Sequence, residues 1–225
     1  FAMLQKAPAM PANTASSVIM QMNGDGRVKM MIGAVDIGQG AITALAQIAA
    51  QELDIPIEHI EISAEIDTRA NPYDWNTVAS KLTFMGGNAV IKASREMLSK
   101  MKAVAAQALR TDPENLLHAN GEIFHRHNPN RRMSYKDVAL GYMYPNGTGI
   151  GGPLISSGSS IADGLTNLHP ETGQGYPAAV WTFGAHAVEI EVDVETGVIT
   201  VLKVASAFDV GQVINEKLVY GQICG

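Results

Sequence analysis

Cysteine is almost absent from this chain of 225 residues, which contains only Cys224. One thiol cannot form an intrachain disulfide, and it cannot supply the four cysteine ligands of an iron–sulfur cluster or a structural zinc site. A chain without disulfides is typical of a reducing compartment, and we therefore expect a cytoplasmic protein.

Long apolar runs and strong positive charge are also missing. No run reaches the roughly 20 apolar residues that cross a bilayer, and residues 1–10 lack the apolar segment of a signal peptide. The net charge is −6, and the densest positive stretch, Arg126 to Arg132, has no regularly interleaved aromatic residues. Nucleic acid is therefore excluded as the main partner. A small anion is not excluded, because backbone amides can bind one.

Aromatic residues make up only 6% of the chain, whereas Gly (22) and Met (11) are plentiful. Glycine lets a backbone or a ligand approach closely, and methionine is most simply interpreted as a filler of irregular core gaps. The chain begins at Phe1 instead of a methionine and ends at Gly225 in a Gly-rich stretch. We therefore expect a segment of a longer protein.

Hydrophobic periodicity predicts an α+β fold of mixed sheets and hairpins with packed helices. Alternating segments flank the turn sequence Asn23 to Gly26, and a second alternating pair flanks Glu195 to Gly197. Apolar residues at helical spacing predict two helices. The expected elements are a first hairpin (18–32), a helix (42–53), a strand (60–62), a long helix (82–109) and a second hairpin (185–207). We place two approximate subdomains at 1–115 and 116–225.

The first candidate binding segment is the turn Gly38, Gln39 and Gly40, which lies between a predicted strand and a predicted helix. The first turn of a helix has unpaired N–H groups and a partial positive charge, so this turn could bind a phosphate or pyrophosphate. Thr43 could add a hydroxyl. The alternative is a tight turn with a solvated Gln39. The pattern is neither GxGxxG nor a P-loop.

The second candidate segment precedes the long helix and consists of Thr77, Val78, Ala79, Ser80 and Lys81. Two hydroxyls, a run of backbone amides and the ammonium of Lys81 would suit an anion. The alternative is that Ser80 is a plain helix cap.

The third candidate segment follows the second hairpin and contains Asp209, Gly211, Asn215 and Gln222. Its alternative is ordinary turn chemistry at the end of a strand. No metal-ligand cluster is expected, because His125 and His127 have no third ligand nearby. His186 alternates on a strand and is interpreted as a packed, hydrogen-bonded residue.

Taken in order, these segments resemble the large subunit of the xanthine dehydrogenase/aldehyde oxidoreductase family, the molybdenum hydroxylases. The runs that carry the resemblance are Asp25 to Leu53, Asp67 to Val90 and Phe183 to Gly225. The resemblance extends over nearly the whole chain from about Ser16 and is weakest between His118 and Gln174. It implies that residues 1–225 are part of a molybdenum-cofactor-binding region in the C-terminal half of such a subunit.

The resemblance also implies what the chain binds. The family uses a molybdenum–molybdopterin cofactor, often as its cytosine dinucleotide, and it hydroxylates heterocycles or aldehydes with oxygen from water. Gln39, Thr77 to Ser80 and Gln222 would contact the pterin, its phosphates or the dithiolene side, with Asp209, Gly211 and Asn215 supporting them. Iron–sulfur clusters and FAD would belong to partner domains or subunits. The family's catalytic glutamate lies beyond this chain, so we expect no catalytic residue within it and no turnover by it alone.

One departure concerns Lys81, since bacterial members commonly have Ser-Arg where this chain has Ser80 and Lys81. Loss of the guanidinium fork would weaken a bidentate phosphate contact. Two other hypotheses remain open at this point. The chain could be a non-catalytic module for a phosphorylated small molecule or nucleotide, or a structural scaffold in a multi-subunit complex.

Overall fold

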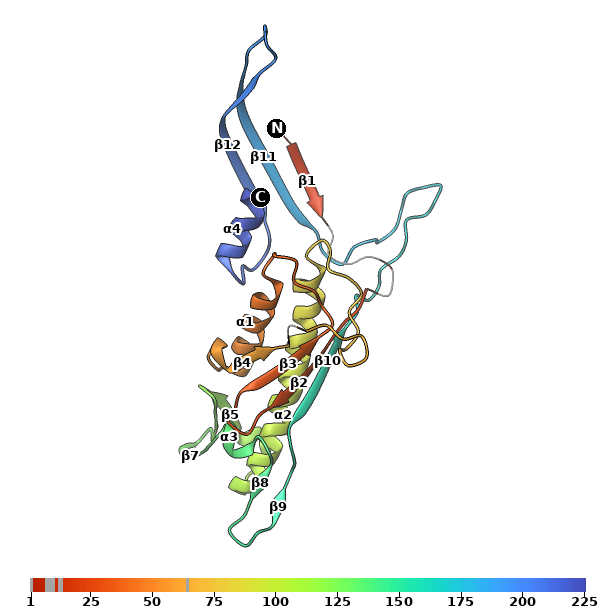
Figure 1. Cartoon of the computed structure of the whole chain (residues 1–225). Coiled ribbons are helices and arrows are strands. Elements are labelled where there is room, and N and C mark those ends of the chain that lie inside the picture. Colours follow the sequence, from red (N-terminus) through yellow and green to blue (C-terminus); the bar gives the residue numbers. More distant parts are fainter. Residues whose placement is uncertain (1, 7–10, 12–13, 64) are drawn as a thin grey trace.

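The structure is a computed structural model that describes residues 2–6, 11, 14–63 and 65–225. A central four-stranded sheet is covered by two helices, a small sheet extends one end of this core, and a long hairpin projects from the other end (Figure 1). The sequence predicted this α+β combination of mixed sheets, hairpins and packed helices, and the prediction is confirmed.

The central sheet has the strand order β10-β2-β3-β4. Its strands are β2 (Ser16–Met22), β3 (Val28–Ile32), β4 (Ile60–Ile62) and β10 (Ile155–Ser160). The strands β2 and β3 form the predicted antiparallel hairpin, and alternate side chains along both are buried, as the period of two requires. The buried faces include Met20, Met22 and Met30, in agreement with the interpretation of methionine as core filler.

Two helices cover this sheet. The helix α1 (Ala41–Leu53) packs on α2 (Gly87–Leu109), and α2 lies along β10 and β2. A π-helical turn, η2 (Leu82–Gly86), leads into α2, so the predicted long helix begins where expected but with wider first turns. Gly158 of β10 lies so close to α2 that an added Cβ would be 2.1 Å from the carbonyl oxygen of Ala89.

Helix α1 begins against the carboxylate of Asp36. Its oxygens accept hydrogen bonds from the N–H groups of Gly38 (2.9 Å), Gly40 (3.3 Å) and Ile42 (3.1 Å). Burial opposes the ionisation of this carboxyl, but these bonds and one from Ala41 outweigh burial and hold the pKa of Asp36 below its ordinary value of 3.8. A side chain from outside the helix thus pairs donors that the first turn cannot pair by itself.

The smaller elements extend the core at the end away from the hairpin. They are η1 (Ile57–His59), η3 (Pro113–Asn115), β5 (Leu116–Ala119), β6 (Glu122–His125), β7 (Asn128–Ser134), α3 (Tyr135–Val138), β8 (Tyr142–Met143) and β9 (Gly149–Ile150). Ser134 and Asp137 form a capping box at the start of α3, which the spacing of these two residues in the sequence predicts. One buried cluster runs from Val18 to Leu154 and includes residues on both sides of position 115. The subdomain division at that position stays a prediction.

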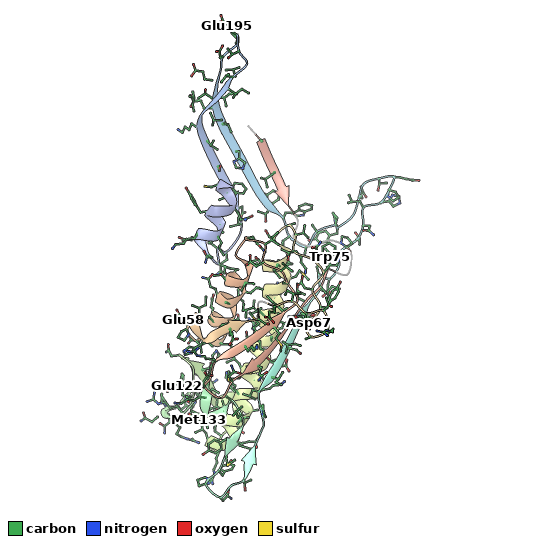
Figure 2. The ribbon with its side chains drawn as sticks, in the orientation of Figure 1. Glu58, Asp67, Trp75, Glu122, Met133 and Glu195 are labelled. Carbon is green, nitrogen blue, oxygen red and sulfur yellow. The ribbon has the colours of Figure 1, made fainter. Side chains whose placement is uncertain are left out.

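The second predicted hairpin is formed by β11 (Thr182–Val192) and β12 (Ile199–Asp209). The strand β1 (Ala2–Lys6) pairs with β11, and α4 (Glu216–Cys224) follows β12. Glu195 marks the tip of the hairpin, far from the core (Figure 2). The Ala- and Pro-rich stretch 1–15 lacks hydrophobic periodicity, which predicts an extended lead-in. The strand β1 forms part of it, and the rest lies largely outside the described residues. No helix of the described chain is long and apolar enough to cross a membrane.

The contact between β10 and α2 makes the size of residue 158 a test of the fold. Gly158→Ala should lower the free energy of unfolding by about 1–3 kcal/mol, because the new methyl group overpacks the backbone of Ala89. Urea unfolding measures this loss. The control is Gly149→Ala, where a Cβ meets nothing within 4 Å and stability should not change. Equal effects of the two substitutions would contradict the packing.

Asp36 provides a pH-dependent test. Asp36→Ala should lower stability at pH 7 by about 1 kcal/mol, because first-turn donors of α1 lose their acceptor. The carboxylate with its lowered pKa stabilises the fold above about pH 3.8, and this contribution is lost as the pH falls through the folded-state value. The stability difference between wild type and variant should therefore shrink below pH 3.8, as followed by urea unfolding across pH. Asp112→Ala, at a residue without a side-chain cap bond, is the control.

Candidate functional site

A cavity of about 570 Å³ lies where the start of α1, the segment before η2 and the segment from β12 to α4 converge. These are the regions of the three candidate segments, which are far apart in the sequence. Of the predicted site residues, the cavity is lined by Gln39, Gly40, Thr77, Val78, Ala79, Ser80, Asn215 and Gln222. The lining does not include Gly38, Thr43, Lys81, Asp209 or Gly211. All three segments meet, but each contributes only some of the residues expected from it.

Contrary to the sequence prediction, the N–H groups of the turn Gly38 to Gly40 are not free to bind a phosphate. The N–H groups of Gly38 and Gly40 already donate to Asp36, so an anion would have to compete with a carboxylate for them. Gly40 also has a packing role, since it has φ 77° and an added Cβ would lie 2.4 Å from Leu218 of α4. The expectation of a free backbone site at this turn is therefore corrected. The sequence signal that was overlooked is an aspartate two residues before the first glycine.

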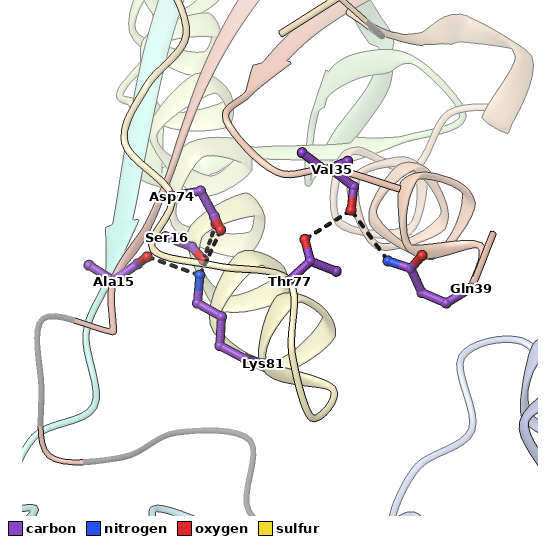
Figure 3. Close-up of polar contacts among 7 residues, drawn as sticks. All are labelled: Ala15, Ser16, Val35, Gln39, Asp74, Thr77 and Lys81. Atoms are coloured by element: carbon purple, nitrogen blue, oxygen red, sulfur yellow. Dashed lines mark hydrogen bonds and ion pairs between the residues drawn. The ribbon is translucent and has the colours of Figure 1, made fainter. Parts of the chain in front are cut away.

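Gln39 is held by its own turn. Its Oε1 accepts the N–H of Ile37 at 2.7 Å, and its Nε2 points toward the carbonyl oxygen of Val35 at 3.5 Å (Figure 3). Thr77 Oγ1 donates to the same Val35 oxygen at 2.9 Å. The first and second candidate segments therefore contact one carbonyl group, which fixes their relative position.

The segment before η2 has an unusual backbone. Ala79 and Ser80 are consecutive residues with positive φ, 49° and 62°, a conformation that costs free energy for residues other than glycine. Within the described chain, none of the N–H groups of Val78, Ala79 and Ser80 donates to a protein acceptor. The interpretation of Ser80 as a plain helix cap is wrong, because Lys81 occupies the cap position and no side chain caps the helix.

Lys81 lies inside the protein instead of in the cavity. Its Nζ donates to Asp74 Oδ1 at 2.8 Å and to the carbonyl oxygen of Ala15 at 3.1 Å, and its side chain is 1% exposed (Figure 3). Burial lowers the pKa of Lys81, and the hydrogen bond and charge of Asp74 partly oppose this effect. The prediction that Lys81 supplies a cation to a phosphate is corrected: its ammonium already has a buried partner.

The third segment places a helix beside the cavity. Asp209 Oδ1 accepts the N–H of Gly211 at 3.0 Å, and both residues are exposed, so this pair forms a local turn at the end of β12. Asn215 caps α4 by accepting the N–H of Leu218 at 3.1 Å, and its Nδ2 donates to Gln47 of α1 at 2.9 Å. These contacts hold α4, which carries Gln222, against α1.

Further lining residues come from the sheet of β1, β11 and β12, where sequence reasoning had found no site. His186 lines the cavity, its Nδ1 lies 2.8 Å from Ser206 Oγ, and its ring meets Phe208 edge to face at 5.2 Å. The prediction of a hydrogen-bonded His186 is confirmed, but its position at the cavity was not foreseen. Thr182 of the same sheet and Thr83 of η2 add hydroxyls to the lining. Strand alternation alone cannot indicate which face of a hairpin will meet a distant helix.

The lining is mostly apolar and contains no Asp, Glu, Lys or Arg. Its polar groups are amide side chains, hydroxyls, backbone N–H groups and the ring of His186. No group of three or more His, Cys, Asp or Glu residues that could hold a metal ion occurs in the described chain. The cavity thus suits a neutral or anionic organic ligand.

The sequence matches the family described as the molybdopterin cofactor-binding domain over residues 2–225. It is 31% identical to a xanthine dehydrogenase molybdenum-binding subunit of Escherichia coli O157:H7, over 91% of this chain and 25% of that protein. It is 30% identical to the nicotine 6-hydroxylase large subunit of Paenarthrobacter nicotinovorans, over 92% of this chain and 24% of that protein. The chain therefore spans about a quarter of these relatives.

Solved structures show the same fold. CO dehydrogenase from Oligotropha carboxidovorans matches 99% of this chain and 27% of its own chain, with a TM-score of 0.79 and 24% identity. The aldehyde oxidoreductase of Desulfovibrio gigas matches 99% of this chain and 21% of its own, with a TM-score of 0.75 and 22% identity. The cavity, the family match and these relatives agree, and the chain belongs to the molybdopterin cofactor-binding domain family of the xanthine dehydrogenase and aldehyde oxidoreductase type.

Proposed function

We propose that the cavity between α1, α4 and the segment Thr77 to Ser80 holds the molybdenum cofactor of an oxidoreductase. The convergence of three distant segments on one cavity of about 570 Å³ carries this proposal. That volume falls within the roughly 300–1,000 Å³ of small-molecule sites. Uncharged donors fit a pterin, whose ring edges offer both donors and acceptors, and they do not repel its phosphate. Without protein metal ligands, the metal would be held by the cofactor itself.

Each segment would have a different role. The unpaired N–H groups of Val78, Ala79 and Ser80 and the hydroxyl of Ser80 would bind the phosphate, because successive N–H groups beside residues of positive φ form an anion-binding concavity. Gln39 and Gln222 would hydrogen-bond the pterin. Gly40 lines the cavity, and its lack of a side chain lets Leu218 of α4 pack against the start of α1. The cofactor supplies redox chemistry when bound, and this chain binds and orients it.

The activity of the whole protein is a further part of the proposal. Relatives named xanthine dehydrogenase and nicotine 6-hydroxylase support a molybdenum oxidoreductase that acts on a small molecule. We propose that the complete protein works in the cytoplasm with iron–sulfur and FAD components, and that its cofactor could carry the cytosine dinucleotide. A nucleotide-binding module without redox chemistry is not favoured by the family match.

The hairpin of β11 and β12 suggests where the rest of the protein packs. Its strands expose Val188, Ile190, Val192, Val201, Leu202 and Val204, each between 47% and 58%. So many exposed apolar side chains on one element mark an interaction surface. Because the chain spans about a quarter of its relatives, we propose that the remainder of the molybdenum subunit covers this hairpin.

The cofactor proposal predicts that molybdenum, phosphorus and pterin copurify with the protein from cells that make molybdopterin. Gln222→Ala should weaken cofactor retention by about 3–10-fold, the effect of one lost hydrogen bond to a neutral group. Molybdenum and pterin per polypeptide, measured before and after gel filtration, report retention. Gln51→Ala, at an exposed residue of α1 outside the cavity lining, is the matched control. A folded protein isolated repeatedly without pterin would contradict the proposal.

The hairpin proposal predicts protection from protease. In the native protein, elastase, which cleaves after small aliphatic residues, should not cleave residues 187–204, because other parts of the subunit cover them. The double substitution Ile190→Asp and Val201→Asp changes two residues that face each other in the hairpin register and should expose this segment. Thr196→Asp, which adds a charge at the turn, should leave it protected. Cleavage of the wild-type hairpin as fast as that of the double variant would refute the proposal.

A further inference from the structure

The segment that lines the cavity is the middle of a loop, residues 74–81, whose two ends meet in the protein interior. At the first end, Asp74 forms a β-bridge with Ser16, and the next residue, Trp75, donates its N–H to the carbonyl oxygen of Ala15 at 3.1 Å. At the second end, the Lys81 ammonium returns to Asp74 Oδ1 and to the same Ala15 oxygen. The side chain of Lys81 thus joins the two ends of the loop (Figure 3).

This contact is an ion pair shielded from water. The side chains of Lys81 and Asp74 are 1% and 4% exposed, and their charged atoms are 2.8 Å apart. The second carboxylate oxygen of Asp74 accepts a hydrogen bond from Ser16 Oγ at 2.6 Å. Every described partner of the ammonium is therefore at the start of β2 or of the loop. A buried charge needs these partners in place, so the pair tolerates little displacement of either loop end.

The stretch between the two ends needs such a constraint. Ala79 and Ser80 adopt left-handed conformations that they would leave in an unrestrained loop. The only other side-chain bond that ties the cavity-lining stretch 77–80 to a distant part of the described chain is that of Thr77 to the Val35 carbonyl. Val78 points its carbonyl to the N–H of Lys81 at 2.8 Å, which closes the turn immediately before the buried lysine.

We infer that the Asp74–Lys81 pair is a positioning clasp: it keeps the unpaired N–H groups of Val78, Ala79 and Ser80 directed at the cavity without touching the ligand. This inference rests on the proposed cofactor site. Lys81 then does not contact the phosphate itself, because its charge holds the backbone whose N–H groups would bind the phosphate. The clasp also gives a reason for two charged side chains at the buried positions 74 and 81, where an apolar pair could pack instead.

Hydrogen–deuterium exchange and cofactor retention together test the clasp in the protein as purified. The variants are Asp74→Asn, Lys81→Met and the double variant, which leaves neither charge unpaired and so guards against simple misfolding. In peptides covering residues 76–84, exchange of the hydrogen-bonded amides of residues 81 and 84 should rise at least tenfold in all three variants, while the interior of α2 stays unchanged. Pterin per polypeptide should fall at least tenfold in the double variant even where its thermal midpoint stays close to wild type.

Tyr135→Phe is the matched control, because it removes a buried hydrogen bond, from Tyr135 Oη to the Leu53 carbonyl at 2.7 Å, away from the cavity. It should lower the thermal midpoint and retain pterin. The clasp is refuted if exchange at 76–84 does not change. It is also refuted if every variant, including Tyr135→Phe, loses pterin in proportion to the fall in its thermal midpoint. A wild-type protein without pterin would overturn the proposed function, whereas the exchange measurement would still decide whether the pair holds the loop.

Discussion

The organisation of the cavity depends on which backbone N–H groups are paired within the protein. A donor that is buried without a partner is costly, so folded chains pair nearly all of them. At the start of α1 the carboxylate of Asp36 takes this role. At the segment before η2, no acceptor among the described residues receives the N–H group of Val78, Ala79 or Ser80. Two helix starts that look equivalent in sequence are therefore different: the donors of one are paired by a side chain of the protein, and those of the other have no acceptor in the described chain.

Much of the fold follows from local patterns. The hairpins around Asn23 to Gly26 and Glu195 to Gly197, the two main helices and the capped α3 were all predictable, because each depends on periodicity or on turn and cap residues within a few positions. The convergence of the candidate segments was inferred from their order and from resemblance. The cavity lining includes residues of every segment, but local patterns could not have shown this.

The errors have a common physical origin, which is that side-chain direction depends on distant partners. Lys81 follows two residues of positive φ, and this reverses the chain so that the ammonium meets Asp74 and Ala15. Nothing in the stretch from Thr77 to Lys81 alone indicates that turn. His186 was likewise interpreted only on its strand, yet β11 brings it to a cavity whose other walls are α1 and α4. Sequence reasoning identifies the segments of a site more readily than the atoms that face it.

The pairing of β1 with β11 has a consequence for the order of assembly. It joins Ala2 to His186, one of the longest sequence separations in the fold, whereas the buried cluster of the core is complete by Leu154. Contacts between distant residues form late, because closing a long loop costs entropy before the contact is made. Leu4, His186 and Phe208 belong to the cavity wall on that late sheet. During synthesis on the ribosome, the pocket therefore stays open on this side until β11 and β12 have emerged.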